Sequence, residues 1–191
     1  MPRVLAALDG RGERDDGTVA ARGNWHARIP SGFELFTQGG NEVSGEIESN
    51  DVLRAAAEAI WVAAQRETWA SLLLVPAEPG LSTAALAEAV AEVGSAQRGE
   101  RVEALDLRGL SLAGSRSAAE KLADESAPYQ RVAAIDCPTD SQTALLLASA
   151  AGVSILVVEL ERTESAAARR VMDLVGPARF LGAVVASPRP T

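Results

Sequence analysis

From about residue 50 to its end, the chain alternates between two kinds of hydrophobic segment. One kind is a short continuous apolar run, such as 71–75, which is typical of a parallel strand buried on both faces. The other repeats its apolar residues near every 3.6 positions, as an amphipathic helix does. The pattern predicts strands at 71–75, 101–107, 132–136, 153–160 and 180–186, and helices that begin at 50 or 51 and then span 82–96, 115–125, 141–151 and 164–175.

This alternation, with its short connections, predicts one α/β domain over residues 50–191. The expected architecture has three layers, with a mainly parallel sheet and helices on both of its faces. Sheets of this kind bind ligands beyond the carboxyl ends of their strands. The loops 76–82, 106–115, 136–141 and 159–164 are therefore where a functional site is expected.

Residues 1–49 show no sustained periodicity and are interrupted by many glycines. We expect a flexible or extended arm with two short apolar islands, at 4–8 and 33–36, that dock on the domain or on a partner. Phe33, Leu35 and Phe36 are the better candidates for such an interface, because aromatic anchors supply much of the energy of protein contacts.

The 191 residues carry a formal net charge of −8. That balance argues against a nucleic-acid-binding surface or a surface for anionic membranes, since both need clustered positive charge. One cysteine, Cys137, and one histidine, His26, leave no disulfide and no Cys/His metal cluster to build. No apolar run reaches the roughly 18 residues that span a bilayer. These features favour a cytoplasmic protein that does not insert into the membrane.

The loop at 76–82 joins a buried strand to the start of a helix. Phosphate-binding loops carry G-x-x-x-x-G-K-[ST] at this position, with a lysine for the phosphate charge. Here Gly80, Ser82 and Thr83 remain, and the only lysine of the chain, Lys121, lies far downstream. Two interpretations stay open, a plain helix cap by Ser82 and a weak anion site.

Two carboxylates end predicted strands at the same edge of the sheet. Asp136 precedes Cys137 and Pro138, in the position where a carboxylate could hold Mg²⁺, and Asp106 ends the second strand of the domain in a similar way. Ordinary strand-end chemistry is the alternative for both. Cys137 is expected to be an inert, partly buried thiol, because the only histidine lies in the arm.

Residues from about 48 to 188 resemble the MinD/ParA-like P-loop ATPases. Among these they most resemble the cytoplasmic domain of the bacterial tyrosine kinases that work with polysaccharide co-polymerases in capsule and exopolysaccharide synthesis. Five segments carry the resemblance. Residues 76–83 match the family pattern SAEPGEGKST, residues 103–109 match V-D-A-D-L-R, and residues 134–148 match I-I-D-T-P-P with the helix that follows it. Residues 156–163 match L-V-V-x-x-x-x-T, and residues 181–186 match L-G-V-V-x-N.

The chain departs from that family at three places. The Gly-Lys portion of the phosphate loop is deleted, so the resemblance implies a degenerate Walker A motif. No tyrosine-rich tail follows the last strand. The E-x-x-R-x-x-R oligomerisation helix is reduced to Asp51-x-x-Arg54-x-x-Ala57, which makes Asp51 and Arg54 the candidates for an interface between copies.

The resemblance and its departures imply a non-catalytic pseudo-ATPase or pseudokinase. It would regulate or scaffold exopolysaccharide export through a membrane co-polymerase or an active paralogue, peripheral to the inner membrane and able to form homo-oligomers. No cofactor is expected, with ATP and Mg²⁺ bound weakly at most through Gly80, Ser82, Thr83, Asp106 and Asp136. The alternative is a divergent ATP-binding switch of the ParA/MinD type, active or inactive, that acts in positioning, division or secretion. In its active form, Arg162 from a neighbouring subunit could replace the missing lysine.

Overall fold

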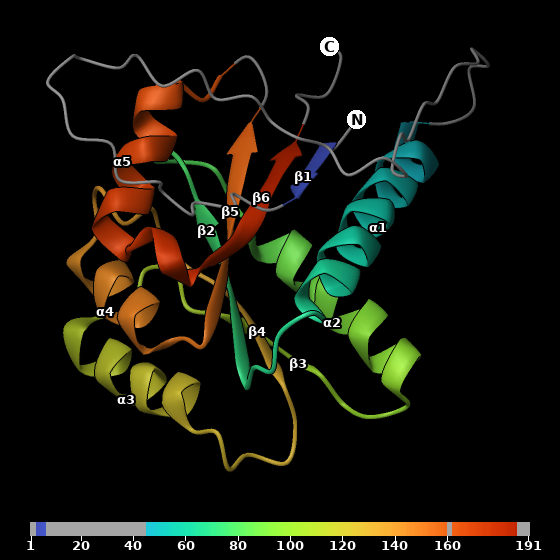
Figure 1. Cartoon of the computed structure of the whole chain (residues 1–191), viewed down its shortest axis with the longest axis horizontal. Coiled ribbons are helices and arrows are strands. Elements are labelled where there is room, and N and C mark those ends of the chain that lie inside the picture. Colours follow the sequence, from blue (N-terminus) through green and yellow to red (C-terminus); the bar gives the residue numbers. More distant parts are fainter. Residues whose placement is uncertain (1–2, 7–44, 160–161, 187–191) are drawn as a thin grey trace, which may run out of the picture.

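The computed structural model describes residues 3–6, 45–159 and 162–186, with α-helices on both faces of a sheet (Figure 1). Within these residues the strands are β1 Arg3–Ala6, β2 Ser71–Pro76, β3 Glu103–Asp106, β4 Arg131–Ala134, β5 Val153–Glu159 and β6 Phe180–Ala186. The helices are α1 Gly45–Ala64, α2 Ala84–Arg98, α3 Leu112–Ala123, α4 Gln142–Ala150 and α5 Ser165–Val175, with a 3-10 turn, η1, at Pro177–Arg179.

The strands form one sheet in the order β1-β6-β5-β2-β4-β3. The strands from β2 to β6 are parallel to their neighbours, which confirms the predicted α/β class with a mainly parallel sheet. β1 is the exception, since it pairs antiparallel with β6 at one edge, with Arg3 opposite Val185. β2 is flanked by β4 and β5, so the loop that follows β2 emerges near the middle of the carboxyl edge.

Successive residues of β2 point into two separate hydrophobic cores. Leu72 and Leu74 pack with α1 and α2, whereas Leu73 and Val75 pack with α3, α4 and α5 on the other face. All four side chains are fully buried. This explains why the sequence shows a continuous apolar run here and not an alternating one.

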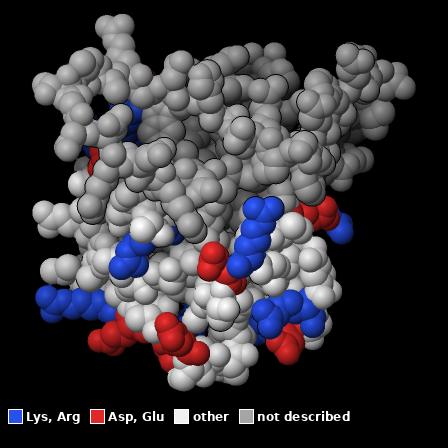
Figure 2. Space-filling model, in the orientation of Figure 1, with Lys and Arg blue, Asp and Glu red and all other residues white. Residues whose placement is uncertain are grey.

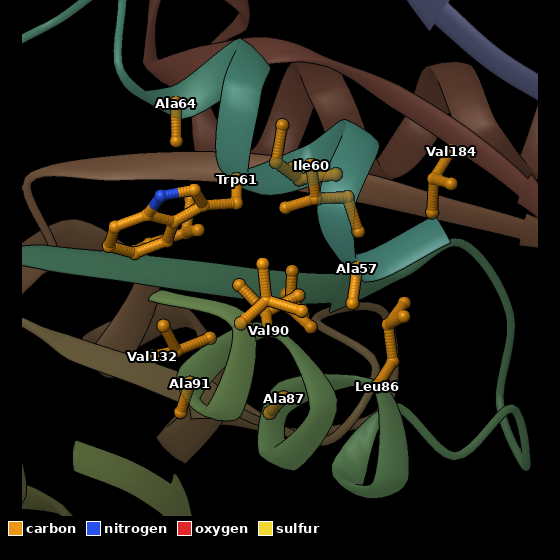
Figure 3. Packing of buried hydrophobic residues seen from close by; sticks show 14 of the residues in the cluster. Ala57, Ile60, Trp61, Ala64, Leu86, Ala87, Val90, Ala91, Val132 and Val184 are labelled. Carbon is orange, nitrogen blue, oxygen red and sulfur yellow. The ribbon is translucent and has the colours of Figure 1, made fainter. Parts of the chain in front are cut away.

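The first of these cores is dominated by the contact between α1 and α2. Figure 3 shows Ile60 and Trp61 of α1 facing Val90 of α2. Trp61 is 1% exposed, and its ring meets that of Trp69 edge to face, with 5.7 Å between centroids. Gly94 of α2 makes room for the indole, because a Cβ at this position would lie 2.4–2.8 Å from three atoms of the Trp61 ring.

The helix starts differ from those predicted. α1 begins at Gly45, before the expected cap at residue 50 or 51. α2 begins at Ala84 and not at Ser82. α3 begins at Leu112 and not at residue 115, because Ser111 Oγ accepts a hydrogen bond from Gly114 N at 3.2 Å and caps the earlier turn. α4 begins at Gln142, one residue after the predicted start, and Ser141 caps it.

Most of the predicted arm over residues 1–49 lies outside the described residues, and so do Phe33, Leu35 and Phe36. The described exceptions are β1, which includes part of the apolar island at 4–8, and the first turn of α1. In the described part of the chain, no helix is both long and apolar enough to cross a membrane.

A group of charged side chains lies at the amino ends of β3 and β4. Arg131 has only 4% of its side chain exposed, and its Nη1 donates to the carbonyl oxygens of Lys121 and Asp124 at 2.6 and 3.1 Å. These carbonyls end α3, so the guanidinium caps that helix. Glu103 neutralises the cluster, with Oε2 lying 3.8 Å from Arg131 Nε and 2.9 Å from Lys121 Nζ. The ring of Tyr129 stacks against Arg131.

Candidate site at the carboxyl ends of the strands

The loops that follow β2, β3, β4 and β5 meet at the carboxyl edge of the sheet, as the topology requires. β5 and β6 point toward the upper edge in Figure 1. Hydrogen bonds that involve side chains link each of these loops to another one. The residues that the sequence predicted for this site are therefore neighbours in space.

The loop after β2 turns sharply before α2. Gly80 has a φ of +81°, a left-handed conformation that favours glycine, and Leu81 N donates to Glu78 O at 3.4 Å. Thr83 is completely buried, and its hydroxyl donates to Leu74 O at 3.3 Å. Thr83 is the N-cap residue of α2, but its side chain points back to β2 and does not cap the helix.

The predicted cap by Ser82 is therefore wrong, and its hydroxyl has another partner. Arg108 Nη1 donates to Ser82 Oγ at 2.6 Å, which joins the loop after β3 to the loop after β2. The rest of the guanidinium forms a bidentate pair with Asp106, with Nε to Oδ1 at 2.7 Å and Nη2 to Oδ2 at 2.6 Å. These hydrogen bonds hold the pKa of Asp106 below its usual value, and Asp106 in turn raises the pKa of Arg108.

Replacing Asp106 with asparagine should change how stability depends on pH. Because the pKa of Asp106 is lowered in the folded state, its carboxylate adds stability above its unfolded value of about 3.8. That contribution is lost as the pH falls through the folded pKa. The free energy of unfolding of the wild-type chain should exceed that of Asp106→Asn at neutral pH, and the gap should close in acid. Urea denaturation between pH 7 and pH 2.5 measures this gap, with Asp173→Asn as the surface control. A gap that stays constant into acid would contradict the assignment.

Asp136 is half-buried and is held by the loop after β3. Its Oδ2 accepts a hydrogen bond from Gly109 N at 2.7 Å, and Gly109 has a φ of +65°. The next residue, Cys137, is buried with its Sγ 3.1 Å from Thr139 Oγ1. Asp136 thus organises the loop after β3 in this structure.

Glu78 and Arg162 also lie at this edge, and the sequence predicts neither of them as a site residue of its own subunit. Glu78 Oε1 accepts from Glu164 N at 2.9 Å, so the loop after β2 caps the start of α5. The sequence predicts a role for Arg162 only from a neighbouring subunit, yet Arg162 lies beside the loop after β2 of its own chain, since its Nη2 would be 3.8 Å from a Cβ on Gly80. Arg162 also pairs with Glu159 at 3.0 Å.

The only lysine of the chain, Lys121, lies near the amino ends of the strands, away from the candidate site. Lys121 pairs with Glu103, which begins β3, whereas Asp106 ends that strand roughly 10 Å away along its axis. Lys121 therefore does not contribute to the loops at the carboxyl ends in this structure.

The candidate interface residues on α1 lie apart from these loops. Arg54 is exposed and pairs with Glu58 one turn later, at 3.2 Å. Asp51 lies on the same helix, and its side chain is outside the described part of the structure. On the described part of the face in Figure 2, positive and negative side chains are interspersed. A role of Asp51 and Arg54 in assembly stays a prediction.

Several solved structures have a similar architecture. The VpsO kinase domain matches with a TM-score of 0.56 and 16% identity, over 78% of this chain and 100% of that one. The BceF tyrosine kinase domain matches with 0.51 and 18%, over 74% and 78%, and the chimerical protein CapA2B2 with 0.50 and 13%, over 74% and 85%. The chain has the fold of these kinase domains. It is a P-loop NTPase-like fold.

No protein-family model and no curated protein sequence matches the chain. At identities of 13–18%, the solved structures establish the fold and leave the activity to be argued from the site. The degenerate Walker A motif and the resemblance to MinD/ParA proteins stay predictions from the sequence.

Proposed function

We propose that this protein is a non-catalytic pseudokinase or pseudo-ATPase of bacterial exopolysaccharide or capsule biosynthesis. It would act as a regulatory or scaffold subunit on the cytoplasmic side of the membrane. Its partner would be a membrane co-polymerase or a catalytically competent paralogue. The fold of the VpsO and BceF kinase domains supports the general assignment, and the chemistry at the strand ends supports the absence of catalysis.

The observation that carries the proposal is the pairing of charged groups at the strand ends. Arg108 is neutralised by Asp106, and Arg162 lies beside Glu159. Phosphoryl transfer depends on positive groups aimed at the charge of the transferring phosphate. Here the guanidinium groups are already paired with carboxylates, so little positive charge remains for a triphosphate.

Mg²⁺·ATP is the ligand that a P-loop NTPase-like fold implies, and the residues present do not fit it. Ser82 Oγ, which such a site would direct to the metal, accepts a hydrogen bond from Arg108. Asp136 accepts one from Gly109. The lysine that would meet the phosphates is missing from the loop.

Calorimetric titration of the full chain with ATP and ADP, with and without Mg²⁺, tests the loss of the nucleotide site. We expect no binding heat at millimolar nucleotide. A variant in which Glu-Gly-Lys replaces Leu81 restores the family loop and is the matched positive control, so binding should appear there. Mg²⁺-dependent binding or hydrolysis by the wild-type chain, abolished by Asp136→Ala, would contradict the proposal.

Genetic complementation tests the role in polysaccharide synthesis. Deleting the gene should reduce the yield of extracellular polysaccharide, and wild-type and Asp136→Ala proteins should restore it equally. Equal restoration is expected because a scaffold needs its fold and not its vestigial acid. An unchanged yield in the deletion strain would refute the pathway assignment. If the wild-type protein restores the yield and a folded Asp136→Ala protein does not, the assignment as a non-catalytic protein would be refuted.

A specific observation favours the ATP-binding switch as the second candidate. Arg108 and Arg162 flank the loop after β2 from opposite sides, through Ser82 and Gly80. If both arginines left their carboxylates, they could replace the charge of the missing lysine. The same titration distinguishes the two functions, because the switch requires binding that Arg108→Ala and Arg162→Ala weaken.

A further inference from the structure

β3 forms the edge of the sheet, opposite the edge that β1 occupies. β4 covers one side of β3, and within the described residues no strand pairs with the other side. Open edges of this kind can accept an additional strand through backbone hydrogen bonds. β3 is also among the most exposed strands, with Ala104 and Asp106 both open to solvent.

The hydrogen-bond pattern identifies which backbone groups face outward. Glu103 N donates to Gln130 O and Leu107 N donates to Ala134 O, so the odd-numbered residues face β4. The groups of Ala104 and Asp106 therefore point away from the sheet. Val102 has the same orientation, but its N–H donates to Ser95 Oγ at 2.9 Å. The open stretch of backbone thus begins after Val102.

A groove of about 430 Å³ runs between this edge and α2. Residues of α2 that lie on one face of the helix, spaced three, four and seven positions after the first, line one side of the groove. Residues at the start of β3 and just before it line the other side. These residues are Glu88, Ala91, Glu92, Ser95, Val102 and Ala104. The floor is apolar, and two carboxylates rise from the helix beside it.

The charges of the groove define what would fit there. Glu88 and Glu92 are exposed, and neither forms an ion pair with another described residue. The nearby cations are bound more closely to other carboxylates, because Arg108 pairs with Asp106 and Arg101 lies 3.5 Å from Glu103. Glu88 interacts with Arg108 only at longer range, as a minor contribution to the raised pKa of that guanidinium. A lysine or arginine can lay its aliphatic stem over the apolar floor and bring its charged end to the two glutamates.

We propose that the outer edge of β3 and this groove bind an extended segment of a partner protein that alternates basic and aliphatic residues. The backbone of the segment pairs with Ala104 and Asp106. Its basic side chains face Glu88 and Glu92, and its aliphatic side chains lie on the other face of the sheet beside Leu105. The proposal concerns a surface next to the strand-end loops and does not depend on whether the protein binds ATP.

Binding of a defined peptide to the isotope-labelled full chain tests this surface. The probe is acetyl-Thr-Lys-Val-Lys-Val-Lys-Thr-amide, followed by NMR. The amide signals of Ala104 and Asp106 should shift, and their hydrogen exchange should slow. Glu88→Gln with Glu92→Gln should weaken binding at least tenfold, whereas Glu120→Gln on α3 with Glu125→Gln in the turn after it removes the same charge elsewhere and should not.

Two further controls separate strand pairing from nonspecific ionic adsorption. The same peptide, N-methylated at its three central residues, keeps its charge but cannot pair and should not bind. Ala104→Pro removes an outward N–H without removing a hydrogen bond to β4, so it should abolish binding in a protein that unfolds at nearly the same urea concentration.

Three results would overturn the proposal. The first is no binding at millimolar peptide, and the second is binding that N-methylation or Ala104→Pro leaves intact. The third is protection of the Ala104 and Asp106 amides in the free chain. In that case the edge is already covered by residues 7–44 or by a second copy, which sedimentation distinguishes.

Discussion

Replacing Arg131 with alanine should lower the free energy of unfolding by about 3–5 kcal/mol, the range for breaking a buried ion pair. Its guanidinium is almost fully buried and satisfies two carbonyl oxygens at the end of α3. Removing it leaves these carbonyls without their donor and leaves Glu103 with less positive charge around it. Urea denaturation followed by circular dichroism measures the loss.

A matched control and a double variant show whether burial is the cause. Arg116 is exposed, so Arg116→Ala should change the stability by no more than about 0.5 kcal/mol. Arg131→Met combined with Glu103→Leu replaces both charged groups with apolar side chains and should be more stable than Arg131→Ala, because it fills the space that alanine leaves and removes the cost of burying charge. A cost below 1 kcal/mol for Arg131→Ala would show that the buried cluster does not stabilise the fold.

Trp61→Ala should also destabilise the protein by about 3–5 kcal/mol, because it opens a large cavity between α1, α2 and the sheet. Trp61 is among the largest fully buried side chains and contacts the ring of Trp69. Urea denaturation should be followed by circular dichroism, since the substitution removes one of the fluorescent residues. Val62→Ala, on the exposed side of the same helix, is the control.

Gly94 provides an independent check on this packing. In the wild-type chain Gly94→Ala forces a methyl group into the Trp61 ring and should cost about 1–3 kcal/mol. In the Trp61→Ala background the ring is gone, so the same methyl group should cost almost nothing. Equal costs in the two backgrounds would contradict the contact between α1 and α2.

The sequence predicted the parallel part of the fold because burial on both faces leaves a visible signal. β2 and β5 are continuous apolar runs, and each has a helical period before and after it. β1 could be predicted only as an apolar island, because its pairing with β6 joins residues far apart in the chain. The start of α3 was missed because Ser111 and Ser115 are both acceptable caps in sequence, and only the fold decides between them.

The position of the candidate site could also be predicted, but its connections could not. Parallel topology places Ser82, Asp106 and Asp136 at one edge of the sheet. The hydrogen bond of Arg108 to Ser82 joins two loops that are separate in sequence, so no local pattern encodes it. The one available signal was the spacing of Asp106 and Arg108, two residues apart after a strand. The role of Glu78 at the start of α5 had no such signal.

β1 returns the chain to the sheet beside β6, so residues 7–44 connect two elements of the same domain and are held at both ends. The entropic cost of closing a loop rises only with the logarithm of its length, and doubling the length costs about 0.6 kcal/mol. Insertions and deletions between β1 and α1 therefore have little effect on the stability of the sheet. The length of that segment can therefore change over evolution at little cost to the stability of the domain.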